Sequence, residues 1–144
     1  MKSPSVGYHL WHASLAWQQA IARALEPHGL THVQFFLLGS LLWFGKQRKS
    51  PKQRELARAS GLDPMMTSQV LRALEQRGLV TRRDDPDDSR AWLLALTPAG
   101  KKAATEAAAA VRAAEARVFA HVDRDELVRA LQLVAAAVSS VPSE

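Results

Sequence analysis

The segment SPKQRELARASGLDPMMTSQVLRALEQRGLVTRRDDPDDSRAWLLALTPAG, residues 50–100, decides the fold of this chain. Residues 50–53 have capping-box spacing with proline at the first helical position, which predicts a short helix that Gly61 ends. Asp63-Pro64 then supplies an N-cap and first-turn proline for another helix, to about Arg77. Two short helices around a glycine-containing turn are typical of a helix-turn-helix, whose second helix is shaped to enter a DNA major groove.

The pattern after Gly78 changes to two extended runs around an acidic turn. The first run is Leu79–Arg83, and the second, Trp92–Thr97, places a large apolar side chain at every second position. Asp84–Asp88, which contains a proline, forms the turn between them. This arrangement predicts a β-hairpin, the wing of a winged helix-turn-helix.

Helices are predicted on both sides of this segment. Residues 6–25 carry apolar side chains at steps of three and four, and a capping box at Thr31 starts a second helix of about 14 residues, apolar all round. Thr97-Pro98 caps an alanine-rich helix to about His121, and the last helix opens at Asp123. We therefore predict a mainly α fold with a small β-hairpin wing: a winged helix-turn-helix flanked by N- and C-terminal dimerisation helices.

Length and composition limit the class of protein. A chain of 144 residues with 47% hydrophobic and 23% charged residues is expected to fold as one domain. It has no cysteine, which excludes disulfides, thiol nucleophiles and cysteine-ligated metal sites. No apolar run approaches the roughly 20 residues of a membrane span, and the N-terminus lacks the apolar core of a secretory signal. We expect a cytoplasmic protein.

The basic charge is concentrated in the middle of the chain. The net charge is +5, and the residues from Lys46 to Arg90 include 11 basic and 7 acidic side chains. Four of these acids lie in the wing turn, so the rest of the segment is strongly basic. A polyanion is the natural partner, and a solvated charged surface is the alternative.

Three motifs resemble the MarR family of multiple-antibiotic-resistance regulators: ELARASGLD at 55–63, LRALEQRGLVTRR at 71–83 and DPDDSRAWLLALTPAG at 85–100. The last is the sharpest, because it joins an acidic turn ending in Asp-x-Arg to a strand and Leu-Thr-Pro-x-Gly. The resemblance implies a dimeric transcription regulator, most simply a repressor, that binds a pseudo-palindromic DNA operator and responds to a ligand. Residues 31–97 would be the DNA-binding region, and residues 1–30 and 98–144 the dimerisation region.

The second short helix is expected to read bases with its outward side chains. Thr67, Val70, Leu71 and Leu74 share one face and should pack inward, which leaves a polar set outside: Met65, Ser68, Gln69 and Arg72. Glutamine can pair bidentately with adenine and arginine with guanine, and methionine can contact a thymine methyl. The alternative is an ordinary exposed helix face. Ser68-Gln69 also departs from the Ser/Thr-Arg of many family members, so no base preference is carried over.

The resemblance implies that Arg90 enters the minor groove and that Asp88 holds its guanidinium. A narrow minor groove has an enhanced negative potential that attracts such a cation. The alternative is an ion pair within the wing. Further side chains are candidates for phosphate contacts or, singly, for surface solubility: Lys46, Lys49, Ser50, Lys52, Gln53, Arg77 and Arg83.

Family members dimerise through their terminal helices, and the apolar residues expected there are Val6, Leu10, Leu127, Leu131, Val134 and Val138. The resemblance also implies a pocket for a small aromatic ligand between these helices and the DNA-binding region. Its candidates are Tyr8, Trp11, His12, Leu15, Phe36 and Trp43, with plain core packing as the alternative. His9 and His12 lack the carboxylates that would complete a metal site. We expect no metal, no cofactor and no enzyme activity.

Two other functions use the same fold. A non-specific architectural DNA-binding dimer would use the basic segment without reading bases, and would show steep salt dependence and no specificity. A protein-binding adaptor would use the winged fold as an interaction surface and would not bind DNA. Met65-Met66 favours the adaptor, because methionine suits adaptable apolar contacts.

Overall fold

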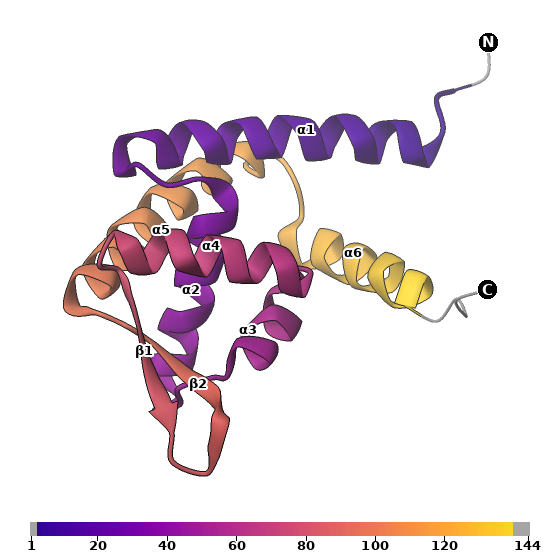
Figure 1. The fold of residues 1–144 in the computed structure, drawn as a ribbon. Helices are drawn as coiled ribbons and strands as arrows, with labels where there is room; N and C mark the ends of the chain where they lie inside the picture. Colours follow the sequence, from indigo (N-terminus) through magenta and orange to yellow (C-terminus); the bar gives the residue numbers. More distant parts are fainter. Residues whose placement is uncertain (1–2, 140–144) are drawn as a thin grey trace.

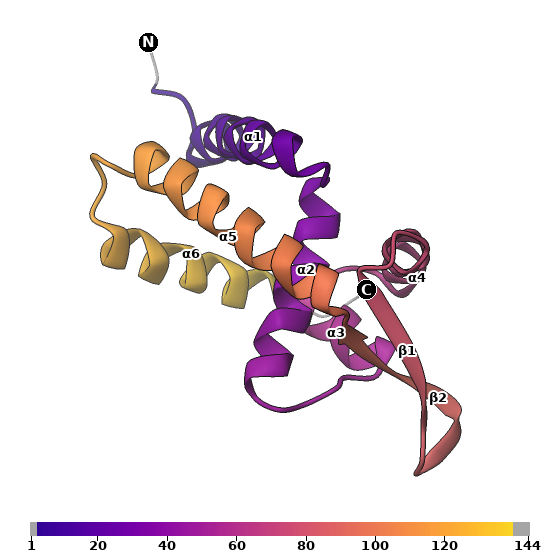
Figure 2. The ribbon, with the colours of Figure 1, turned by 90° about the vertical axis from the view of Figure 1, so that its left-hand side faces the viewer.

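The computed structural model describes residues 3–139 and contains six α-helices and one two-stranded antiparallel hairpin in that range. Figures 1 and 2 show α1 at one end of the molecule and the hairpin projecting from the other. The elements in chain order are α1 (Val6–Leu25), the 3-10 turn η1 (Glu26–His28), α2 (His32–Lys46), α3 (Gln53–Ser60), α4 (Pro64–Gln76), β1 (Val80–Asp85), β2 (Asp88–Leu96), α5 (Pro98–Val118) and α6 (Arg124–Ser139). The predicted mainly α fold with a winged helix-turn-helix is confirmed.

Local capping signals place the start of most helices where they were predicted. The Thr31 hydroxyl accepts from the Gln34 backbone N–H at 3.2 Å, and the Gln34 side chain accepts from the Thr31 N–H at 3.1 Å. Asp63 caps α4, Thr97 caps α5, and an Asp123 carboxylate oxygen accepts from the backbone at the start of α6. These contacts span only three residues, so the sequence alone identifies them.

The start of α3 differs from the prediction. The helix begins at Gln53 rather than Pro51, and the Glu55 side chain accepts from the Lys52 backbone N–H. Residues 51 and 52 are extended against the wing instead, because the Pro51 carbonyl accepts from the Leu94 N–H at 2.9 Å. Pairing with β2 therefore replaces the predicted Ser50 cap.

The wing is longer than predicted, and α5 is shorter. The strands pair from Val80 with Leu96 to Asp85 with Asp88, so the turn is only Pro86-Asp87 and not the whole of 84–88. An Asp85 carboxylate oxygen accepts from the Asp87 N–H at 2.9 Å, which closes this tight turn. The ladder is irregular just before the turn, because Asp84 pairs with Trp92 and Asp85 with Asp88, which leaves residues 89–91 of β2 without paired partners in β1. The α5 helix ends at Val118 instead of about His121.

The core lies where α2 passes between the flanking helices and the winged helix-turn-helix. Leu37 and Leu38 of α2 are fully buried, together with Leu71 of α4 and Leu94 of β2. On the other side α5 contributes small side chains such as Ala107, so α1 and α2 both pack closely against it. The helix-turn-helix and the flanking helices thus share one hydrophobic core.

In contrast, α6 has no buried residue and projects from the end of α5 (Figure 1). Its apolar side chains remain largely in solvent, with Leu131 44% and Val138 70% exposed. A helix with an unburied apolar stripe needs a further surface to cover it. No helix within residues 3–139 is long and apolar enough to cross a membrane.

Candidate nucleic-acid interface

The recognition helix α4 is fixed by its inner face. Thr67, Leu71 and Leu74 are fully buried, and Val70 is half-buried against the core. The Asp63 carboxylate accepts from the Met66 N–H at 2.8 Å, and the Thr67 hydroxyl donates to the Asp63 carbonyl at 2.9 Å. This confirms the predicted inward face.

The outer face of α4 carries the predicted base-reading residues. Met65 is 73% exposed, Gln69 and Arg72 are exposed, and Ser68 is half-buried. The Arg72 guanidinium donates to the Ser68 hydroxyl at 3.4 Å and to the Ser68 carbonyl at 3.5 Å. These long, exposed contacts hold Arg72 over the middle of the face without burying it. Base reading by this set stays a prediction.

The wing presents Arg90 in solvent beside its turn. The Asp88 carboxylate accepts from the backbone N–H of Arg90 at 3.0 Å, and its second oxygen lies 3.9 Å from the Lys52 ammonium. Among residues 3–139 no ion pair between Asp88 and the Arg90 guanidinium is formed, which corrects the expected role of Asp88. The cause is the strand geometry: Asp88 is close enough to bind the backbone two residues on, and Arg90 remains available.

Lys52 connects the start of α3 to the wing. Its ammonium lies 3.3 Å from the carboxylate of Asp85, whose side chain is only 7% exposed. The Asp87 backbone N–H that donates to Asp85 holds the pKa of this carboxyl below its ordinary value of 3.8, and Lys52 lowers the pKa further, against a smaller opposing effect of burial. Lys52 was predicted only as a phosphate contact, and the structure gives it two carboxylate partners as well.

Apart from Arg77, the other predicted phosphate-contact residues lie in two places. Lys46, Lys49 and Gln53 lie around the α2–α3 connection, the two lysines exposed and Gln53 half-buried. Arg83 donates to the Ser50 hydroxyl at 3.4 Å, which brings these two side chains together at the base of the wing.

Arg77 has internal partners instead. It donates to the Gly29 carbonyl at 2.9 Å and lies 3.5 Å from the Gln34 side-chain oxygen, so it ties the end of α4 to the turn before α2. Arg77 is therefore not part of the proposed interface.

Sequence reasoning did not identify the link between the recognition helix and the wing. Arg82 Nε of β1 lies 2.8 Å from Glu75 Oε2 of α4, an ion-pair distance without the alignment of a hydrogen bond. The Arg82 side chain is half-buried, so this contact helps set the angle between α4 and the hairpin. No local pattern predicts it, because it depends on how the strand crosses the helix.

The predicted dimer residues are uncovered in the single chain. Val6 and Leu10 of α1 are exposed, as are Leu131, Val134 and Val138 of α6, while Leu127 is half-buried. Their burial between two copies stays a prediction.

The predicted ligand residues do not form one site within the chain. Phe36 and Trp43 line a cavity of about 470 Å³ on α2, together with Phe35, Gly39, Ser40, Phe44 and Ala59. Tyr8, Trp11, His12 and Leu15 of α1 are exposed and do not line this cavity. Tyr8 packs instead against His9 and His12, at ring-centroid distances of 5.5 and 4.3 Å.

A polar cluster joins α1, α2 and α5. The Trp17 indole N–H donates to Glu115 at 3.3 Å, and the Trp17 ring meets the His32 ring edge-on at 5.0 Å. Burial lowers the pKa of His32 below its ordinary value of 6.5, and the nearby Glu115 partly opposes this. Among residues 3–139 no group of three or more His, Asp or Glu side chains is arranged to hold a metal ion.

Comparison with known proteins agrees with this geometry. The sequence pattern of the MarR family matches residues 30–92. The helix-turn-helix transcriptional regulator YdcH of Bacillus subtilis is 37% identical over 122 residues, which cover 85% of this chain and 83% of YdcH.

Two solved structures are also similar. CouR of Rhodococcus jostii RHA1 bound to p-coumaroyl-CoA matches with a TM-score of 0.79 and 29% identity, covering 97% of this chain and 95% of CouR. Rv2887 of Mycobacterium tuberculosis in complex with DNA matches with a TM-score of 0.69 and 32% identity, covering 92% and 98% of the two chains. With the winged helix-turn-helix described above, these similarities show that the chain belongs to the MarR family of helix-turn-helix transcriptional regulators.

Proposed function

We propose that two copies of this chain form a sequence-specific DNA-binding repressor in the cytoplasm, released from its operator by a small aromatic ligand. The observation that carries the proposal is the exposed face of Met65, Gln69 and Arg72 on α4, next to a wing that presents Arg90 to solvent. In Figure 2 α4 and the hairpin lie together on one side of the molecule, away from α6. Such a pair suits a major groove and the adjacent minor groove.

Charge supports the same orientation. Lys46 and Lys49 are exposed beside the wing base, and Arg83 lies with Ser50 on the same connection. Cations in these positions would contact backbone phosphates and fix the protein on the duplex without reading sequence.

A dimer would provide the second recognition helix. The uncovered apolar stripes of α1 and α6 support residues 1–30 and 98–144 as the dimerisation region and 31–97 as the DNA-binding region. A two-fold dimer places its recognition helices about one duplex turn apart, which matches a pseudo-palindromic site.

The proposed ligand site begins at the aromatic cavity of Phe36 and Trp43. The exposed Tyr8 and Trp11 of α1 are available to complete it in the dimer. Two relatives support an aromatic effector: Rv2887 has been solved with salicylic acid, and CouR with p-coumaroyl-CoA.

The test is operator binding by titration at several salt concentrations, using the region upstream of the protein's own gene and a scrambled duplex. Arg72→Ala should reduce the preference for the operator by about 1 to 3 kcal/mol. Lys49→Gln should weaken both duplexes similarly and flatten the salt slope by about one unit. Lys102→Gln, on the exposed first turn of α5, is the matched control and should change neither.

The same titration decides between the alternatives. Equal affinity of the wild-type protein for both duplexes would support the architectural dimer, and no affinity for either would support the protein-binding adaptor.

A further inference from the structure

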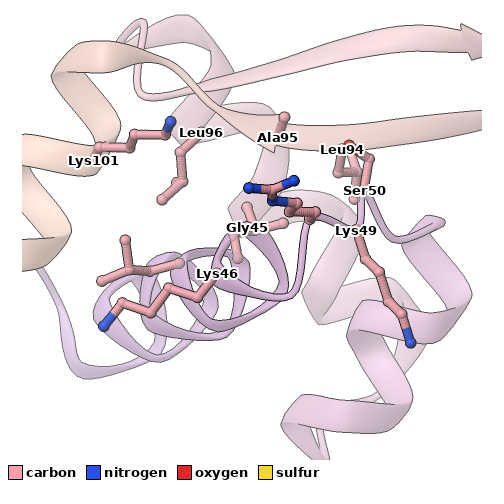
Figure 3. Close-up of a pocket in the computed structure, with 11 residues that line it drawn as sticks. Gly45, Lys46, Lys49, Ser50, Leu94, Ala95, Leu96 and Lys101 are labelled. Atoms are coloured by element: carbon pink, nitrogen blue, oxygen red, sulfur yellow. The ribbon is translucent and has the colours of Figure 1, made fainter.

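A second cavity, of about 400 Å³, lies at the base of the wing. It is formed where the end of α2, the 48–50 connection, the second half of β2 and the first turn of α5 meet (Figure 3). It shares no lining residue with the aromatic cavity on α2. It is therefore a separate site.

The lining has a basic rim and an aliphatic wall. Lys46, Arg48, Lys49 and Lys101 supply four positive charges, and no acidic side chain lines the cavity. Within residues 3–139 none of these four side chains has an ion-pair partner, although Lys52 close by has two. Like charges gathered around a concavity raise the local potential and favour an anion there.

The aliphatic part of the lining is made of four leucines: Leu42 and Leu96 are half-buried, whereas Leu41 and Leu94 are buried. Figure 3 shows Leu96 beside Lys101, whereas Lys46 at the end of α2 and Lys49 on the connection that follows extend outward at the cavity's edge. A DNA phosphate would satisfy the cations and leave this wall empty. A ligand with an anionic head and an aliphatic body would use both surfaces.

The backbone of Arg48 provides an independent observation. Arg48 has φ +54°, the left-handed conformation that usually belongs to glycine at a helix end, and it is the only non-glycine residue with positive φ within residues 3–139. The Lys49 N–H donates to the Phe44 carbonyl at 3.0 Å, which completes the helix-end motif around Arg48. An arginine at a position suited to glycine indicates a use for its side chain, and that side chain lines the cavity.

We propose that this cavity binds an aliphatic organic anion, an alkyl chain with a carboxylate or phosphate head. Lys101 and Arg48 hold the head, and the half-buried Leu42 and Leu96 contact the chain. A doubly charged head is favoured because these two side chains supply two positive charges, with Lys46 and Lys49 at the cavity's edge. The absence of aromatic lining residues here separates this ligand class from the aromatic ligand proposed for the cavity on α2.

The experiment uses the full-length protein without DNA, so its result is independent of the proposed operator binding. Octyl phosphate, octanoate and neutral octanol are titrated while the leucine methyl resonances are followed by NMR. We expect saturable shifts at Leu42 and Leu96, no shift at Leu131 on α6, and affinity in the order octyl phosphate, octanoate, octanol. The first two ligands distinguish a phosphate from a carboxylate as the head.

Lys101→Gln should weaken octyl phosphate binding roughly threefold to fivefold, the effect of removing one exposed charge partner. Lys102→Gln is the matched control, because Lys102 is the next residue on the same exposed turn and does not line the cavity. Equal binding of octanol and the anions, equal effects of the two variants, or shifts confined to other methyl groups would each overturn the proposal.

Discussion

Gly100 in the first turn of α5 permits a close approach of two backbones. A Cβ atom built at this position would lie 1.9 Å from the Leu79 carbonyl oxygen and 2.9 Å from its carbon, whereas ordinary contact begins near 3.4 Å. Gly100→Ala therefore requires a displacement of about 1.5 Å between α5 and the start of the hairpin.

The Leu79 backbone cannot move freely to relieve this contact. Its carbonyl accepts from the Thr97 N–H at 3.1 Å, and its own N–H donates to the Leu74 carbonyl at 3.0 Å. Overpacking costs about 1 to 3 kcal/mol, and each weakened hydrogen bond adds about 0.5 to 1.5 kcal/mol. Alanine recovers up to about 1 kcal/mol through its higher helix propensity. We expect a net destabilisation of about 1 to 5 kcal/mol.

Urea unfolding followed by circular dichroism measures this change, at one fixed protein concentration because a dimer's stability depends on concentration. Gly39→Ala within α2 is the control, since a Cβ there meets no atom within 4 Å, and it should raise stability by up to about 1 kcal/mol. A Gly100→Ala protein as stable as the wild type would refute the packing argument.

Three further outcomes follow from individual side chains. Arg48→Gly should raise the free energy of unfolding by up to about 1 kcal/mol, because glycine relieves the left-handed strain; unchanged urea midpoints would contradict this. Burial keeps His32 neutral by lowering its pKa, so the unfolded state binds more protons below pH 6.5 and stability should fall as the pH drops through that value. His32→Gln should flatten the fall, and an unaltered pH profile in urea unfolding would exclude His32 as its source. Leu131→Asp should weaken dimerisation at least about tenfold in sedimentation experiments, because each copy would lose an exposed leucine that the proposed interface covers; wild-type dimerisation would remove α6 from the interface.

Much of the candidate interface was predictable from the chain alone. The outward face of α4 follows from its Asp63 cap and the period of its apolar residues, and the wing follows from alternation around the acidic turn. The contacts that fix the orientation of the wing relative to α3 and α4 were not predictable. Lys52 meets Asp85 only because the start of α3 lies against the wing, and Arg82 meets Glu75 only because β1 crosses the end of α4.

The sequence by itself determined where most helices begin, which face of α4 is apolar, the acidic segment in which the hairpin turns and which family the chain resembles. These features depend on residues three or four apart, or on alternation along one strand, so they are present before any long-range contact forms. The tertiary structure alone decided that residues 51 and 52 pair with β2, that Arg77 is held by the Gly29 carbonyl, and that four cations surround an aliphatic cavity. Each of these joins segments far apart in the chain, and their distances and directions are set by the packing of α2 and α5 on the shared core.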